Sequence, residues 1–312
     1  MVPCPICGDT ADKPVLARAA LSAADVSDLV HCRTCDVICF DPLPTAEILD
    51  RFYAKVKFGL RPRSAEAGGA WFGRRLRKIA PAGRFLDVGC GTGFFLKGLE
   101  QSTSWEVHGV EFSRVAADFA RDRLGLAVKK GSLSEAGYPE AYFDYVHLNN
   151  VLEHVPDPVG LLGECRRILK PAGRIYLAVP NGLNDCRSLI DFHRSENLPA
   201  HSPSGHIYFF SARTLDQLFD RLGLTVCSRR TGSLKPGLRN SGILARKKNW
   251  KDHHFPPRDQ QSVADQGVAI QPEKRWPAWY YRYRNWSAEL GHLPGLHEFG
   301  LDFLFELRRG PE

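Results

Sequence analysis

A glycine-rich turn after a short apolar run is the part of this sequence best suited to bind a nucleotide-like ligand. The run Phe85–Val88 carries a carboxylate at Asp87, and an apolar helical pattern begins at Phe94. Between them lie Gly89, Cys90, Gly91 and Gly93. A strand, a glycine turn and a helix in this order form the nucleotide-binding crevice of an open parallel sheet. Glycine suits such a turn because a ligand can approach a backbone that carries no Cβ.

The spacing of the glycines narrows the class of ligand. The dinucleotide fingerprint is Gly-x-Gly-x-x-Gly, whereas this loop has Gly-x-Gly-x-Gly, and no Gly-Lys-Ser/Thr of a P-loop follows. The loop resembles the first motif, Asp-x-Gly-x-Gly-x-Gly, of class I S-adenosylmethionine-dependent methyltransferases. The resemblance implies a Rossmann-like α/β fold with a parallel sheet and an antiparallel C-terminal strand. It also implies contacts to S-adenosylmethionine from Asp87, Gly89, Cys90, Gly91 and Gly93. The alternative is a turn that only packs a helix on a strand.

The resemblance extends over about residues 84–230 and implies further cofactor contacts. In the family an acidic residue after the second strand holds the ribose hydroxyls, and Glu111 occupies this place. A carboxylate can accept from both hydroxyls at once, although an acid at a helix N-terminus is also favoured by the helix dipole. The other positions at which the resemblance implies contacts are Phe112, Ser132, Leu133, Asn149 and His154. Ser132 replaces the acid usual in the family.

The residues after the fourth predicted strand bear on the methyl acceptor. The run Val-Leu-Glu-His-Val-x-Asp-Pro at 151–158 resembles that of small-molecule methyltransferases. The Asn/Asp-Pro-Pro-Phe/Tyr motif of enzymes that methylate base or glutamine amines is replaced by Asn149-Asn150-Val151-Leu152. Base N-methylation is therefore disfavoured, and the sequence predicts an oxygen or carbon acceptor on a small molecule or glycan.

His206 is the candidate catalytic residue, as a general base for the acceptor proton. The segment Gly205–Ser211 partly matches the Glu-His-x-x-Tyr-Phe-Ser run of deoxysugar C-methyltransferases, which it resembles. Gly205 stands in place of the Glu and Phe209 in place of the Tyr. A structural role for His206 is the alternative.

Two Cys-x-x-Cys pairs near the N-terminus have the spacing of a metal site. They comprise Cys4, Cys7, Cys32 and Cys35. Two such pairs close a tetrahedral thiolate site that fits structural Zn²⁺, and metal binding would help so small a module to fold. Iron and unligated thiols are the alternatives. Together with the segment after them, the pairs resemble the zinc-ribbon leader of many bacterial class I methyltransferases.

Alternating apolar runs and amphipathic stretches predict the organisation of the chain. Strands are expected at 85–88, 105–110, 126–130, 143–148, 174–179 and 224–230, with helices between them, as in a parallel sheet covered on both faces. An Arg-, Gly- and Ala-rich linker is expected at 61–70, and a final strand at 300–307. The predicted segments are 1–44 (zinc-ribbon-like module), 45–80 (helical linker), 81–230 (S-adenosylmethionine-binding domain), 231–275 (flexible insertion) and 276–312 (aromatic segment and final strand).

Composition leaves two other classes of function open. The 312 residues carry a net charge of +7, which solvated basic helix faces explain but which also suits an RNA methyltransferase recruited by the zinc ribbon. A non-catalytic scaffold that keeps the fold is the other class. The aromatic segment 276–286 is a candidate lid or clamp for a sugar, lipid-linked or nucleic-acid ligand. The alternative is a helix that packs its aromatic residues on the domain or on a second copy of the chain. No apolar run reaches the length of a membrane span, and the absence of a signal-peptide pattern predicts a cytoplasmic protein.

Overall fold

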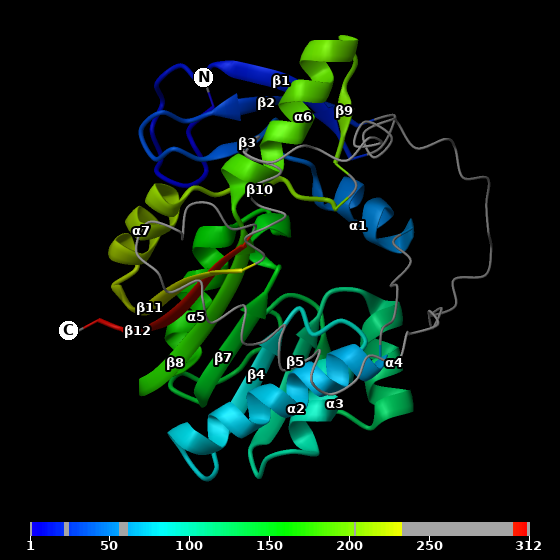
Figure 1. The fold of residues 1–312 in the computed structure, drawn as a ribbon, viewed down its shortest axis with the longest axis vertical. Helices are drawn as coiled ribbons and strands as arrows, with labels where there is room; N and C mark the ends of the chain where they lie inside the picture. Colours follow the sequence, from blue (N-terminus) through cyan, green and yellow to red (C-terminus); the bar gives the residue numbers. More distant parts are fainter. Residues whose placement is uncertain (1, 22–24, 56–61, 203, 233–301, 311–312) are drawn as a thin grey trace.

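The computed structural model describes residues 2–21, 25–55, 62–202, 204–232 and 302–310. The described chain forms two sheets, one above the other in Figure 1, with a seven-stranded sheet as the larger. Residues 233–275 of the predicted insertion and residues 276–301, 311 and 312 of the last predicted segment lie outside the described residues. Thr231 and Gly232 are described and end a strand. Among the helices that the structure describes, none is both long and apolar enough to cross a membrane.

The seven-stranded sheet has the order β11-β12-β8-β7-β4-β5-β6. Its strands are β4 (Arg84–Val88), β5 (Glu106–Glu111), β6 (Val128–Lys130), β7 (Phe143–Asn149), β8 (Leu169–Pro180), β11 (Leu224–Gly232) and β12 (Asp302–Arg309). The five strands β4 to β8 pair in parallel, whereas β12 runs antiparallel to both β8 and β11. The predicted parallel sheet and its antiparallel C-terminal strand are confirmed.

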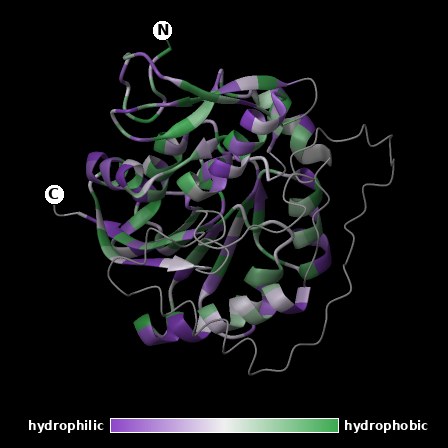
Figure 2. Ribbon diagram, turned by 45° about the horizontal axis from the view of Figure 1, so that its top comes forward, coloured by the Kyte–Doolittle hydropathy of each residue, from purple (hydrophilic) through white to green (hydrophobic). Residues whose placement is uncertain are grey.

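Helices cover both faces of this sheet because its strands are apolar on both sides. The described helices are α1 (Ala46–Lys55), α2 (Pro62–Ile79), α3 (Phe94–Glu100), α4 (Arg114–Leu124), α5 (Pro158–Ile168), α6 (Gly182–Glu196) and α7 (Ala212–Arg221). Of these, α2, α3, α4, α5 and α7 pack on the large sheet. Alternate strand residues divide between two cores: Phe85 and Tyr145 pack with α2, α3 and α4, whereas Leu86 and Val146 pack with α5 and α7. Figure 2 shows hydrophobic residues along the strands and both kinds of residue around the helices.

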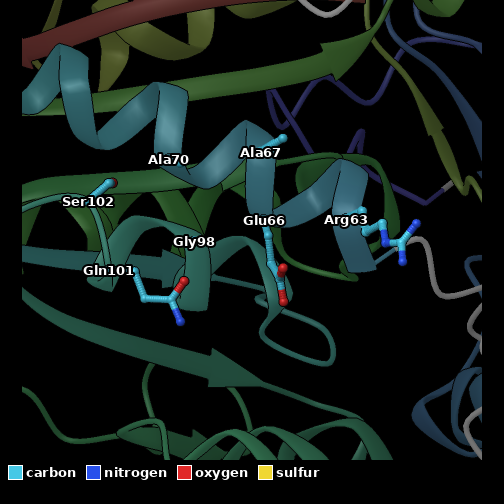
Figure 3. Close-up of a pocket in the computed structure, with 7 residues that line it drawn as sticks. All are labelled: Arg63, Glu66, Ala67, Ala70, Gly98, Gln101 and Ser102. Atoms are coloured by element: carbon cyan, nitrogen blue, oxygen red, sulfur yellow. The ribbon is translucent and has the colours of Figure 1, made fainter. Parts of the chain in front are cut away.

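Residues 62–70 form the first half of α2, so the prediction of a linker at 61–70 was wrong. The reason is a close contact between α2 and α3, which Figure 3 shows beside a shallow pocket. A Cβ on Gly69 would lie 1.9 Å from the carbonyl oxygen of Phe95, and one on Gly98 would lie 2.0 Å from that of Glu66. The small residues that indicate a linker therefore allow two helix backbones to touch.

Gly69→Ala should lower the free energy of unfolding by about 1–3 kcal/mol, the usual cost of overpacking. The added methyl group would meet backbone that cannot move aside without shifting α3. Urea unfolding measures the change. Gly68→Ala is the matched control, because a Cβ there would meet only a Phe95 side-chain atom at 3.9 Å. Equal midpoints for the two variants would contradict the close contact.

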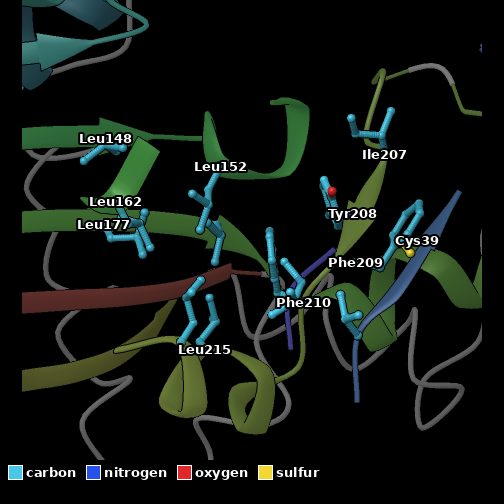
Figure 4. Close-up of a cluster of buried hydrophobic side chains, with 14 of the residues drawn as sticks. Cys39, Leu148, Leu152, Leu162, Leu177, Ile207, Tyr208, Phe209, Phe210 and Leu215 are labelled. Atoms are coloured by element: carbon cyan, nitrogen blue, oxygen red, sulfur yellow. The ribbon is translucent and has the colours of Figure 1, made fainter. Parts of the chain in front are cut away.

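The second sheet, of five strands, joins two distant parts of the chain. It has the order β10-β3-β2-β1-β9, with β1 (Val15–Ala20), β2 (Val26–His31), β3 (Ile38–Asp41), β9 (Ala200–His201) and β10 (Tyr208–Phe209). Cys39 pairs with Tyr208, and Ala20 pairs with His201. Figure 1 shows α6 lying along this sheet, and Figure 4 shows Cys39, Tyr208 and Phe209 in a core that continues to leucines of the large sheet.

Candidate functional site

The glycine turn between β4 and α3 places three glycines in the left-handed region, with φ of 71° at Gly89, 55° at Gly91 and 83° at Gly93. A Cβ on Gly89 would lie 2.7 Å from Val151, and one on Gly93 would lie 2.6 Å from Leu126. A Cβ on Gly91 would meet nothing within 4 Å. Gly89 and Gly93 therefore permit packing, whereas Gly91 borders space that a ligand can occupy.

Glu111, at the end of β5, fastens this turn to the start of α4. Its Oε2 accepts a hydrogen bond from the backbone N–H of Gly91 at 2.8 Å, and its Oε1 accepts one from Ser113 at 2.8 Å. Burial raises the pKa of the carboxyl, against these two hydrogen bonds. Each carboxylate oxygen can accept a second bond, so the geometry suits two neighbouring hydroxyls of a ligand.

Asp87 is held by a residue that the sequence analysis missed. Oδ1 of Asp87 lies 2.7 Å from Nδ1 of His147, and both side chains are buried. The imidazole of His147 stacks between the rings of Phe95 and Tyr176, with centroids 4.8 and 5.0 Å away. His147 faces Asp87 across the parallel pair β4–β7. The sequence could have indicated this contact, because His147 is a polar residue at the position of β7 that pairs with Asp87.

The remaining predicted cofactor residues lie at or just after the carboxyl ends of β4, β5, β6 and β7, or in the short helix that follows β7. Phe112 is 49% exposed and Asn149 is exposed, whereas Leu133 and Cys90 are buried. Burial raises the pKa of Cys90 well above its ordinary value. Ser132 gives its backbone N–H and its hydroxyl to Oε2 of Glu135, at 2.7 and 2.8 Å. The loop after β6 thus contains a carboxylate, supplied three residues beyond the position that the resemblance indicated.

A second polar cluster lies where the short 3₁₀ helix η1 (Leu152–His154) meets the segment before β10. The structure places His154 beside His206, with ring centroids 4.8 Å apart. Nδ1 of His206 lies 2.5 Å from Oδ2 of Asp185, and its Nε2 lies 3.8 Å from Oε1 of Glu153. The backbone N–H of Ile207 donates to the carbonyl of Glu153 at 2.9 Å, which fixes the two segments together.

Burial and charge set the protonation of this cluster. Desolvation raises the pKa of Glu153 to about 7 and lowers that of His154 to about 4. Burial acts to lower the pKa of His206, but the hydrogen bond and charge of Asp185 outweigh it and raise the pKa. His206 was predicted as a candidate base, whereas Asp185 and Glu153 were not among the predicted site residues.

The four N-terminal cysteines converge as their spacing predicts. Sγ of Cys4 lies 3.7 Å from Sγ of Cys35, the same distance separates Cys7 from Cys32, and all four sulfurs lie within 4.8 Å of one another. Thiolates bound tetrahedrally to Zn²⁺ at about 2.3 Å lie about 3.8 Å apart. The donor set therefore fits a structural zinc ion.

Comparison with known proteins places the chain in a family. The family model described as a methyltransferase domain matches residues 63–229. The ubiquinone biosynthesis O-methyltransferase of Alkalilimnicola ehrlichii is 35% identical over 104 residues, which cover 31% of this chain and 42% of that protein. An uncharacterized 37.1 kDa protein in transposon TN4556 of Streptomyces fradiae is 28% identical over 185 residues, or 57% of this chain and 49% of that protein.

The chain thus spans about half or less of the length of these curated relatives. Among solved structures, the 4+2 cyclase SpnF superposes with a TM-score of 0.51 at 16% identity, covering 86% of this chain and 98% of that one. This likeness concerns the fold alone, which is the Rossmann-like α/β fold of methyltransferases. Because the family model matches more than half of its residues, the chain belongs to the methyltransferase domain family.

Proposed function

We propose that the protein transfers a methyl group from S-adenosylmethionine to an acceptor. The observation that carries the proposal is the arrangement at Gly91, which borders open space while its N–H is fixed by Glu111. Glu111 would accept from the ribose hydroxyls through its remaining lone pairs, and the backbone at Gly91 would lie against the ligand. Around them the proposed cofactor contacts are Asp87, Gly89, Cys90, Gly93, Phe112, Ser132, Leu133, Asn149 and His154.

The acceptor in this proposal is an oxygen or carbon of a small molecule or glycan. The bound cofactor supplies a methyl group already activated on a sulfonium. His206 takes the acceptor proton, because the bond from its Nδ1–H to Asp185 leaves the lone pair on Nε2. The methyl group replaces that proton on the acceptor, and the proton leaves through His206. The name of the Alkalilimnicola relative, an O-methyltransferase, favours an oxygen acceptor.

Zinc bound by the four cysteines is the second part of the proposal. The strand pairing supports a structural role, because β3 follows the second cysteine pair and pairs with β10, which begins two residues after His206. The backbone N–H of Phe40 also donates to the carbonyl of Ile207. The two Cys-x-x-Cys pairs would thereby hold the segment that contains His206. An RNA acceptor would show itself as binding that weakens steeply with salt.

Glu111→Gln should weaken the binding of S-adenosylhomocysteine by about 10- to 100-fold in isothermal titration. A hydrogen bond to a charged group contributes about 1.5–3 kcal/mol, and the neutral amide can accept through only one atom. Glu106→Gln, at the other end of β5, is the matched control and should bind as the wild type does. A folded wild type that does not bind S-adenosylhomocysteine would sink the proposed activity.

A further inference from the structure

Glu153, His154 and His206 form a second group with the geometry of a metal site, separate from the cysteines. One ligand atom from each of the three lies within 4.8 Å of the others. Nε2 of His154 is 3.7 Å from Oε1 of Glu153, and Nε2 of His206 is 3.8 Å from the same oxygen. Two imidazole nitrogens and one carboxylate oxygen therefore converge on one point.

The opposite nitrogen of each imidazole is already engaged. Nδ1 of His154 lies 3.2 Å from the carbonyl oxygen of Gly205, and Nδ1 of His206 lies 2.5 Å from Asp185. Histidines that ligate metals usually donate their other N–H to a backbone carbonyl or a carboxylate, which fixes the ring and leaves the lone pair for the ion. His154 has a backbone carbonyl as this partner, and His206 has a carboxylate.

The carboxylate of Glu153 gives the strongest argument for a bound cation. The residue is 1% exposed, and neither oxygen has a hydrogen-bond partner in the part of the chain that the structure describes. A buried polar group left without a partner is costly. Charge from Asp185 and Asp302 acts on Glu153 as well, so two further carboxylates add to the local negative charge. A cation bound at Glu153 would satisfy its oxygens and offset that charge.

We propose that Glu153, His154 and His206 bind one divalent first-row transition cation, through a glutamate oxygen and the two Nε2 atoms. Two imidazoles and a carboxylate suit zinc, iron(II) and cobalt(II) better than calcium or magnesium. The site does not depend on the proposed methyl transfer. The two are linked because Nε2 of His206 can hold either the cation or the acceptor proton. The cation-bound protein therefore lacks the base that the proposed reaction uses.

Titration of the full chain with Co²⁺, after its cysteines have been loaded with one equivalent of Zn²⁺, tests the site. We expect one further equivalent to bind and to give visible d–d absorption without the thiolate charge-transfer band that cobalt at the cysteines would show. Glu153→Gln and His206→Ala should each weaken this binding by at least about 100-fold. Asp185→Asn should weaken it by about 10- to 100-fold, as removal of a supporting carboxylate does.

Glu135→Gln is the matched control, since this carboxylate lies in another loop and should leave cobalt binding unchanged. The proposal is overturned if the zinc-loaded wild type binds no equivalent of Co²⁺. It is also overturned if Glu153→Gln and His206→Ala bind Co²⁺ as tightly as the wild type does. Should Glu153→Gln fail to fold, the His206→Ala titration alone decides. Binding of S-adenosylhomocysteine is measured separately on the same samples, so loss of the cation site is distinguishable from loss of the cofactor site.

Discussion

Replacing His206 by alanine should lower turnover by about 10²- to 10⁴-fold, the range that general acid–base catalysis contributes. The affinity for S-adenosylhomocysteine should stay within about twofold of the wild type, because His206 is proposed to contact the acceptor and not the cofactor. The reason for a large effect is geometric: Asp185 fixes Nδ1, so Nε2 is the only imidazole atom that can take the proton. Radiolabelled methyl transfer to a cell extract measures turnover without knowledge of the acceptor.

Asp185→Asn separates positioning from proton transfer. Its amide can hold the His206 ring but stabilises the imidazolium less well, so turnover should fall by a smaller factor than in His206→Ala, with the KM for the cofactor unchanged. His193→Ala is the control from the same helix, because His193 bonds only to the carbonyl of Leu198 among the contacts described. Undiminished turnover in His206→Ala would remove this residue from the reaction.

Disrupting the cysteine site should affect both stability and turnover. For Cys35→Ser we expect loss of bound zinc and a fall in the free energy of unfolding of about 4 kcal/mol or more, the range seen when a structural metal is lost. Turnover should fall at least about tenfold at temperatures where the main domain stays folded. The reason is that β3, which follows Cys35, pairs with the strand directly after His206.

Metal content, thermal unfolding and methyl transfer, measured on one preparation, check this expectation. Cys227→Ser is the matched control, since Cys227 is exposed and lies outside the cluster. If Cys35→Ser kept wild-type turnover while lacking zinc, the zinc-bound cysteine pairs would not be what holds the His206 segment.

The parallel sheet and the glycine turn could be predicted because their signals are local. The strands at 85–88 and 143–148 are short segments rich in apolar and aromatic residues. The turn after the first of them is recognisable from its glycines alone. The cysteine cluster could also be predicted, because two Cys-x-x-Cys pairs supply the four thiolates of one tetrahedral site. The signals of each strand, of the turn and of each cysteine pair depend on residues close together in the chain.

The acceptor side of the site could not be predicted in the same way. Helix α6 follows Pro180 and begins with Gly182, and a proline and a glycine so close together in the sequence indicate a loop. The helix is stabilised because it buries Cys186 and Phe192 against the small sheet. Because α6 was not predicted, the contact between Asp185 and His206 was not predicted either. Strands of two residues, such as β9 and β10, carry no periodic signal. Tertiary contacts decide all of these elements.

The five-stranded sheet also constrains the order of events during synthesis on the ribosome. Strands β1, β2 and β3 emerge early, but both outer partners, β9 and β10, emerge only after most of the large sheet. Until then β1 and β3 present bare edges of the kind that invite pairing with another nascent chain. Zinc bound by the four cysteines would hold the loops beside these strands together but would cover neither edge. The small sheet is therefore protected from such pairing only once β9 and β10 have been synthesised.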